Sequence, residues 1–168
     1  MGDWVWELNT DGRFTDVSER VQKVLGRAPA WLLGRRPFDL MPAEEARRME
    51  AVFRSIVADA RPFHDLECTC LHGNGGLRIM STSGVPVFGD GGALLGYRGV
   101  NRDITDQRRR EAELRALMDA IPDLIFFKDA DGRYLECNQA FTRFIGRPRA
   151  PRLAAPKRPS STSPTTIC

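Results

Sequence analysis

One stretch of this chain occurs twice, about 120 residues apart. Residues 11–27 read DGRFTDVSERVQKVLGR, and residues 131–147 read DGRYLECNQAFTRFIGR. Upstream, Trp6 of the first copy corresponds to Phe126 of the second. A period of about 120 residues is too long for a solenoid repeat of roughly 20–50 residues, and it has the size of a small domain. The sequence therefore predicts one complete domain followed by the opening of a second.

The bulk composition is that of a globular protein. Apolar residues make up 42% of the 168-residue chain, which is enough to build a core. No apolar run approaches the roughly 18 residues of a membrane span, and no signal peptide opens the chain. We therefore expect a cytoplasmic protein with no membrane span in this chain.

The net charge of +3 arises in the last 21 residues. Residues 148–168 hold four basic side chains and no acidic one, so they carry +4 and the remaining chain sums to −1. We therefore expect no specific nucleic-acid partner. The same residues are rich in Pro, Ser and Thr, which predicts a disordered basic tail that cannot complete a sheet. A truncation or a reading-frame change near residues 147–151 would explain why the second domain stops there.

Hydrophobic periodicity and turn residues predict the elements of the first domain. Strands are expected over 4–8 and 13–17, 63–71, 77–87 and 93–102, and the longest helix over 42–60. Ser18 is placed to cap a short helix that ends at Gly26. Two strands, short helices, one long helix and three strands predict an α+β fold, in which an antiparallel sheet has helices on one face.

A separate helix is predicted over residues 103–121. Apolar and polar residues follow a 3-4-3-4-3 spacing along it, at Ile104, Gln107, Glu111, Leu114, Met118 and Ile121. This is the a/d spacing of a coiled coil, although the seam is polar in its middle. We expect a homodimer through this linker helix, and a solvated monomeric linker remains the alternative.

The four cysteines give no sign of a metal site or a disulfide. Cys68 and Cys70 lie two residues apart, which places both on one face of a strand. There is no C-x-x-C pair and no Cys/His spacing typical of zinc. Free thiols in a reducing compartment are the expected state, and no metal ligand is predicted.

The end of the first domain resembles a known family. Residues 84–105 read GVPVFGDGGALLGYRGVNRDIT and resemble the last hairpin of PAS sensor domains. The triplet Asp103-Ile104-Thr105 matches the point where a PAS core continues into an output helix. Residues 4–8, the turn at 11–13 and Leu25-Gly26 are similar to the start of the domain.

This resemblance implies a fold and a role. PAS domains are five-stranded antiparallel sheets with helices over one face and a cavity between. The resemblance implies four regions: a PAS domain over 1–105, a linker helix over 106–121, the start of a second PAS domain over 122–147 and a tail over 148–168. It implies a sensory or regulatory input module of a bacterial signalling protein, of the histidine kinase (two-component) or cyclic-di-GMP type. A ligand-free structural dimerisation module is the alternative.

Alternation along the strands indicates which residues face the cavity. Gly99 leaves room for something to approach, and a buried amide such as that of Asn101 must bond either to the protein or to a ligand. The junction residues Asp103, Ile104 and Thr105 are expected to pass a change to the linker helix. The predicted ligand-binding residues are Trp4, Trp6, Phe53, Met80, Thr82, Tyr97, Gly99 and Asn101.

The known cofactors of the family are disfavoured, and the ligand stays unknown. Flavin-binding light sensors of this family carry a cysteine in an Asn-Cys-Arg motif after the early helices, and residues 27–41 contain no cysteine. Haem-binding members need an axial histidine, usually on the long helix, and residues 42–60 contain none. A small organic molecule or no ligand remains. No catalytic residue is predicted, because neither a phosphate-binding loop nor a nucleophile motif occurs, and an enzymatic output would belong to the parent protein.

Overall fold

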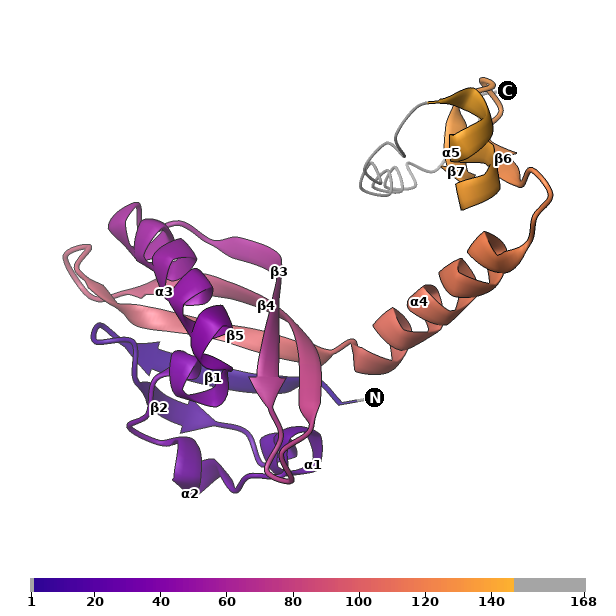
Figure 1. The fold of residues 1–168 in the computed structure, drawn as a ribbon. Helices are drawn as coiled ribbons and strands as arrows, with labels where there is room; N and C mark the ends of the chain where they lie inside the picture. Colours follow the sequence, from indigo (N-terminus) through magenta and orange to yellow (C-terminus); the bar gives the residue numbers. More distant parts are fainter. Residues whose placement is uncertain (1, 147–168) are drawn as a thin grey trace, which may run out of the picture. The chain divides into compact units, whose positions relative to one another are not determined.

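The computed structural model describes residues 2–146, which form two compact units that divide between Glu111 and Ala112 (Figure 1). The first unit contains a five-stranded sheet with its helices on one face. The second contains a short hairpin and one helix. The predicted disordered tail over residues 148–168 lies outside the described residues. No helix among residues 2–146 has the length and apolar character needed to cross a bilayer.

The sheet of the first unit is antiparallel throughout, in the order β2-β1-β5-β4-β3. The first strand of this sheet, β1, therefore lies beside its last strand, β5, which places residues 4–9 next to residues 96–101. The predicted α+β class and five-stranded sheet are confirmed. The strands are β1 (Trp4–Asn9), β2 (Phe14–Val17), β3 (Phe63–Leu71), β4 (Leu77–Phe88) and β5 (Leu94–Asp103).

Alternating side chains separate the two faces of the sheet. In β1, Trp4, Trp6 and Leu8 are buried, whereas Val5 and Glu7 are exposed on the other face. The helical segments cover the buried face and contribute Leu25, Leu32, Met49 and Ile56 to the core. They are α1 (Arg20–Leu25), α2 (Pro29–Leu32), the 3-10 helix η1 (Pro37–Leu40) and α3 (Ala43–Ala58).

The start of α1 differs from the sequence expectation. The N-cap position is Glu19, and its side chain makes no capping hydrogen bond. The predicted capping role of Ser18 is wrong, because the Ser18 hydroxyl accepts a hydrogen bond from the backbone N–H of Val5 at 3.1 Å. The Ser18 hydroxyl therefore makes a long-range hydrogen bond to β1 and does not cap α1.

The helix α4 (Thr105–Ala120) follows the sheet directly and contains no buried residue. A helix was predicted over residues 103–121, and its role as a linker stays a prediction. The second unit continues with β6 (Phe126–Lys128), β7 (Tyr134–Cys137) and α5 (Gln139–Ile145), and the two strands pair antiparallel. This order of strand, strand and helix repeats the opening of the first unit.

Candidate ligand cavity and signal junction

A small, mostly apolar cavity lies between the buried face of the sheet and the segment from Pro37 to Phe53. Its volume is about 50 Å³. Sites for drug-sized ligands usually measure about 300–1,000 Å³, whereas a single water needs roughly 10–15 Å³. The space therefore holds a few waters or a very small molecule without rearrangement. The lining residues are Trp6, Leu8, Phe14, Pro37, Phe38, Leu40, Met41, Met49, Phe53, Phe63, Leu66, Cys68, Cys70, Thr82 and Asn101.

Four of the eight predicted ligand-binding residues line this cavity, namely Trp6, Phe53, Thr82 and Asn101. Trp4, Met80 and Tyr97 are buried in the surrounding core, each with no more than 2% of its surface exposed. Their predicted contact with a ligand stays a prediction.

The free space at Gly99 is taken by the protein itself. A Cβ atom at Gly99 would lie 2.4 Å from the Trp6 ring and 2.3 Å from the Ser83 carbonyl oxygen. A Cβ atom at its cross-strand neighbour Gly84 would lie 2.7 Å from the Phe63 ring. The two glycines thus let the stacked rings of Trp6 and Phe63, 6.4 Å apart, lie flat on the sheet.

The polar groups of the cavity come from the centre of the sheet. The Trp6 indole N–H donates to the Asn101 Oδ1 atom at 2.7 Å in a buried hydrogen bond. Because the indole is only a donor, this bond fixes the amide orientation and turns the Asn101 Nδ2 donors away from Trp6. Among residues 2–146, neither this Nδ2 group nor the hydroxyl of its cross-strand neighbour Thr82 has a hydrogen-bond partner. The cavity thus offers unused donors on an otherwise apolar surface.

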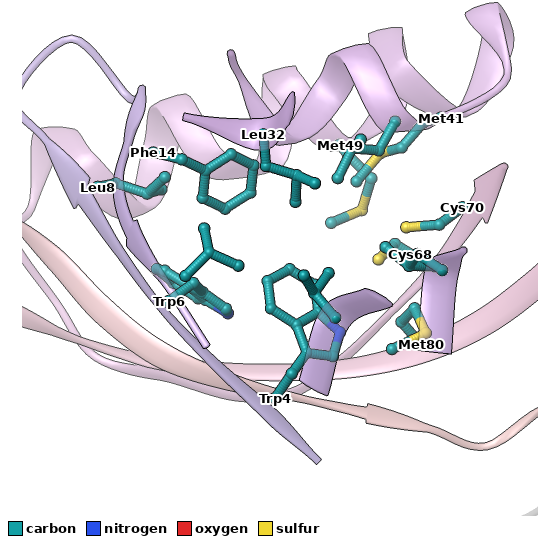
Figure 2. Close-up of a cluster of buried hydrophobic side chains, with 14 of the residues drawn as sticks. Trp4, Trp6, Leu8, Phe14, Leu32, Met41, Met49, Cys68, Cys70 and Met80 are labelled. Atoms are coloured by element: carbon teal, nitrogen blue, oxygen red, sulfur yellow. The ribbon is translucent and has the colours of Figure 1, made fainter. Parts of the chain in front are cut away.

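A second buried donor lies in the same row of the sheet. Trp4 pairs with Asn101 across β1 and β5, and its indole N–H is buried without a partner among the described residues. Figure 2 shows Trp4 and Trp6 side by side beneath the helices. An unpaired buried N–H costs free energy, so an internal water or a ligand oxygen near this row would be stabilising.

An aromatic group closes the end of the core near Phe53. The Phe53 ring packs edge-on against Phe63 and Tyr97, with centroids 6.1 and 5.5 Å apart. The Tyr97 hydroxyl donates to the Ile56 carbonyl oxygen at 3.1 Å, which joins β5 to α3. Burial raises the pKa of Tyr97 above its ordinary value. These contacts make the tyrosine a fixed part of the core.

Two thiols line the opposite end of the cavity. Cys68 and Cys70 are 4% and 2% exposed, and the structure contains them as free cysteines. A hydrogen bond with Cys68, followed by burial, raises the pKa of the Cys70 thiol well above its ordinary value. Both thiols are buried on the same face of β3, as the spacing predicted.

The junction between β5 and α4 is held by a compact hydrogen-bond network. The Asp103 Oδ1 atom accepts from the Thr105 backbone N–H at 2.9 Å and from the Thr105 hydroxyl. The same hydroxyl accepts from the backbone N–H of Ile79 at 2.9 Å, and the Ile79 carbonyl accepts from Ile104 N–H at 2.9 Å. The three predicted junction residues thus all join the start of α4 to β4.

Charged side chains extend this connection to the edge strand. Arg108, in the first turns of α4, forms an ion pair with Glu67 of β3 and a second with Glu111 at 2.9 Å. Arg78 of β4 lies 3.7 Å from Asp103. The first turns of α4 therefore contact two strands of the sheet, β3 and β4.

Sequence reasoning missed most of the cavity wall, since four of its fifteen lining residues were among the predicted ligand-binding residues. Phe38, Leu40 and Met41 come from the segment around η1. Pro and Gly residues at positions 29, 34 and 37 allow only short helical turns to be predicted there. The signal was present as a run of apolar residues in a polar loop, because such residues are exposed only at a cost unless they cover something. Cys68 and Cys70 were assigned to one face of a strand, but nothing in the spacing said which face.

The fold and the site together define a class of small sensory α+β domain. A family model described as the PAS fold matches residues 1–109, and a second, described as the PAS domain, matches residues 112–164. The chain belongs to the PAS family, with one PAS domain followed by a second, partial one. A comparison with curated proteins returns no match.

Solved structures share the fold at low sequence identity. A PAS domain from Colwellia psychrerythraea has a TM-score of 0.57 and 21% identity, covering 62% of this chain and 87% of that one. The N-terminal domain of a diguanylate cyclase with PAS/PAC sensor from Marinobacter aquaeolei has a TM-score of 0.59 and 15% identity, covering 64% and 99%. A sensory box histidine kinase/response regulator from Burkholderia thailandensis E264 has a TM-score of 0.55 and 19% identity, covering 68% and 86%.

Proposed function

We propose that residues 1–105 are a sensory input domain that passes a conformational change to α4. The observation that carries this proposal is the hydrogen-bond network of Asp103, Thr105 and Ile79, which joins the first turn of the helix to the sheet. A ligand or partner that prefers one arrangement of β4 and β5 also prefers one position of the helix start. The domains of similar fold in a diguanylate cyclase and a histidine kinase suggest an output of one of those types.

The cavity suggests what kind of signal enters. The Asn101 Nδ2 group in its wall is an unused hydrogen-bond donor, so a ligand with acceptor oxygens suits it. The unpaired indole N–H of Trp4 lies in the same row of the sheet, in the core beside the cavity. A volume of about 50 Å³ restricts an unassisted ligand to a few heavy atoms. Anything larger has to displace Phe38 or Phe53, which are half-buried and lie on the helical side of the cavity. A reducing, cytoplasmic location suits the buried free thiols.

The alternative is a structural dimerisation module with a filled core, and the small cavity favours it. In both cases we place the dimer contact on α4. Leu114 and Leu117 are 63% and 66% exposed in the single chain, and such a pair on one helix is stabilised by a partner helix. The two functions differ in whether occupancy of the cavity changes the dimer.

The junction is tested in the intact signalling protein that carries this domain. Asp103→Ala removes the acceptor that holds Thr105, and we expect the output activity to lose its dependence on the stimulus. Asp106→Ala is the matched control, because Asp106 lies in the first turn of α4 and is exposed. Stimulus dependence that survives Asp103→Ala would contradict the sensory proposal.

The dimer contact is tested on the chain by analytical ultracentrifugation. Leu114→Glu places a charge in the expected seam, so the dimer should dissociate at least tenfold more readily. Ala116→Glu adds the same charge about 200° around the helix and should leave the dimer intact. A chain that is monomeric before any substitution, or a dimer unaffected by Leu114→Glu, would rule out the α4 contact.

A further inference from the structure

Five sulfur atoms gather at one end of the core, and together they form the sulfur cluster of this domain. Two are the thiols of β3, one lies on β4, and two lie on the segment above the sheet. All five side chains are at least nine-tenths buried. The cluster consists of Cys68, Cys70, Met80, Met41 and Met49.

We propose that the sulfur cluster binds one soft monovalent metal ion, Cu(I), between the two cysteines and a methionine of the helical side. Four of its members, Met41, Met49, Cys68 and Cys70, line the same cavity of about 50 Å³. The fifth, Met80, lies directly opposite Cys68 in the β3–β4 register. Figure 2 shows the sulfur atoms on the same side of the buried cluster, away from Leu8 and Phe14.

The ligand types select the metal. Thiolates and thioethers are soft donors that prefer Cu(I), whereas Zn²⁺ takes four ligands of Cys, His or carboxylate type. Among residues 2–146, no three His, Cys, Asp or Glu side chains come together, so a zinc or hard-metal site is not formed. Only a metal that accepts thioether sulfur can use this cluster, because the methionines supply the ligands beyond the two cysteines.

Charge balance also favours a monovalent ion. The site is enclosed by apolar side chains, and a buried ion needs a compensating charge close by. One thiolate neutralises Cu(I), and the second cysteine and a methionine can then bind as neutral donors. A divalent ion would leave one positive charge unbalanced unless both cysteines were ionised side by side.

The nearby charged groups are already engaged and leave the sulfur atoms as the available ligands. Glu45 of α3 accepts from the Thr69 N–H at 3.0 Å and from Arg48 at 2.7 Å. Arg48 also donates to the Glu67 carbonyl oxygen at 3.0 Å. Asp103 of β5 is held by Thr105 and Arg78. Each of these charged groups thus has hydrogen-bond or ion-pair partners of its own, whereas the sulfur atoms of Cys68, Cys70, Met41 and Met49 line the cavity.

The test is an anaerobic competition for Cu(I) against the chromophoric chelator bicinchoninate, with ascorbate as reductant. The full-length chain carries Cys137→Ser and Cys168→Ser, so that Cys68 and Cys70 are the remaining thiols. We expect one Cu(I) per chain, displacement by Ag(I), and no competition by Zn²⁺. Failure of this chain to withdraw Cu(I) from the chelator would overturn the proposal.

Two kinds of variant locate the ion. Cys68→Ser and Cys70→Ser should each abolish binding, and the double variant Met41→Leu/Met49→Leu should weaken it by about tenfold or more. Leucine conserves the volume of methionine, so this double variant tests the thioethers even if a cysteine variant fails to fold.

Met118→Leu, on α4, is the matched control and should bind Cu(I) as tightly as the parent chain does. Unchanged affinity in Met41→Leu/Met49→Leu would also overturn the proposal. Neither result bears on the signalling proposal, which rests on Asp103.

Discussion

The hairpins β1–β2 and β6–β7 are built in the same way at corresponding positions. In the first, Gly12 N–H donates to the Asn9 carbonyl and Asn9 N–H to the Arg13 carbonyl, both at 3.0 Å. In the second, Gly132 and Asp129 make the same two bonds at the same distances. Both ladders shift register at the same place, after Glu7 and after Phe127. The two copies of the repeat therefore form the same turn with the same register shift.

The two helices that follow also end alike. Gly26 and Gly146 take φ values of 66° and 64°, in the left-handed region that stops a helix. Ser18 and Asn138 occupy equivalent positions. Ser18 accepts a hydrogen bond from the N–H of Val5 in β1, and Asn138 accepts one from the N–H of Ile125, which directly precedes β6. Asn138 does more than Ser18, because it also caps α5 by accepting from Phe141 N–H at 3.1 Å.

Burial separates the two copies. Phe14 and Leu25 are 3% and 0% exposed, whereas their counterparts Tyr134 and Ile145 are 56% and 44% exposed. The first copy is covered by α3 and by the strands β3 to β5, and the described part of the second has no equivalents of them. Local sequence thus sets the shape of the hairpin and the helix, and the long-range elements supply the core.

The largest expected contrast comes from matched truncations of the two helices. Leu25→Ala should destabilise the first unit by about 2–5 kcal/mol, because it opens a cavity in a fully buried position. Ile145→Ala should cost about 0.5 kcal/mol, as for a surface substitution. Hydrogen exchange followed separately over β1–β2 and β6–β7 measures both losses. Equal losses would mean that the second copy has a core of its own.

The helix-ending glycines give a smaller contrast. Gly26→Ala adds about 1–2 kcal/mol of backbone strain and also places a Cβ atom 2.6 Å from the His72 ring. Gly146→Ala adds the strain alone, since among residues 2–146 no atom beyond its chain neighbours lies within 4 Å of its Cβ position. Protection of the last turn of each helix should fall in both variants and further in Gly26→Ala. A larger effect at Gly146 would contradict this view of the two environments.

A pH dependence is expected for the first unit. The raised pKa of Tyr97 means that the folded state holds its proton more tightly than the unfolded chain, whose tyrosine titrates near 10.0. The stabilisation is fully present below that pH and is lost as the pH rises through the higher pKa of the folded state. The urea midpoint, followed by tryptophan fluorescence, should therefore fall above pH 10, and less steeply in Tyr97→Phe. If the urea midpoint falls equally steeply with pH in the parent and in Tyr97→Phe, groups other than Tyr97 cause the loss of stability.

The smallest expected contrast between the two copies concerns the turn, where matched substitutions should have the same effect. Asn9 Oδ1 accepts from the N–H groups of Asp11 and Arg13, and Asp129 Oδ1 accepts from those of Asp131 and Arg133. Asn9→Ala and Asp129→Ala should each weaken the turn by about 0.5–1.5 kcal/mol. Exchange rates at Arg13 and Arg133 measure this. A clear difference between the two turns would show that the surrounding fold acts on them as well.

The sequence was informative wherever structure is set locally. Strand β3 was predicted with its observed bounds, and the inward positions Trp4, Thr82 and Asn101 followed from alternation. The cavity wall around Phe38 and Met41 was not predictable in this way, because it depends on how an irregular segment packs against the sheet.

The second limit on prediction from the sequence was the choice of hydrogen-bond partner for a polar side chain. The Ser18 oxygen bonds to Val5, and the Asn101 amide bonds to Trp6, 95 residues away. Each of these bonds is one of several that the side chain can make, and the fold decides between them. Spacing along the chain identifies a buried polar group, but it does not identify its partner.

The coupling of the sheet to α4 is tested most directly by hydrogen exchange at the Ile79 amide, whose acceptor is the Thr105 hydroxyl. The account predicts that Asp103→Ala speeds exchange at Ile79 and in the first turn of α4 together, and that Asp106→Ala changes neither. Fast exchange in α4 with an unchanged Ile79 amide in Asp103→Ala would contradict it, because the helix would then loosen without the sheet.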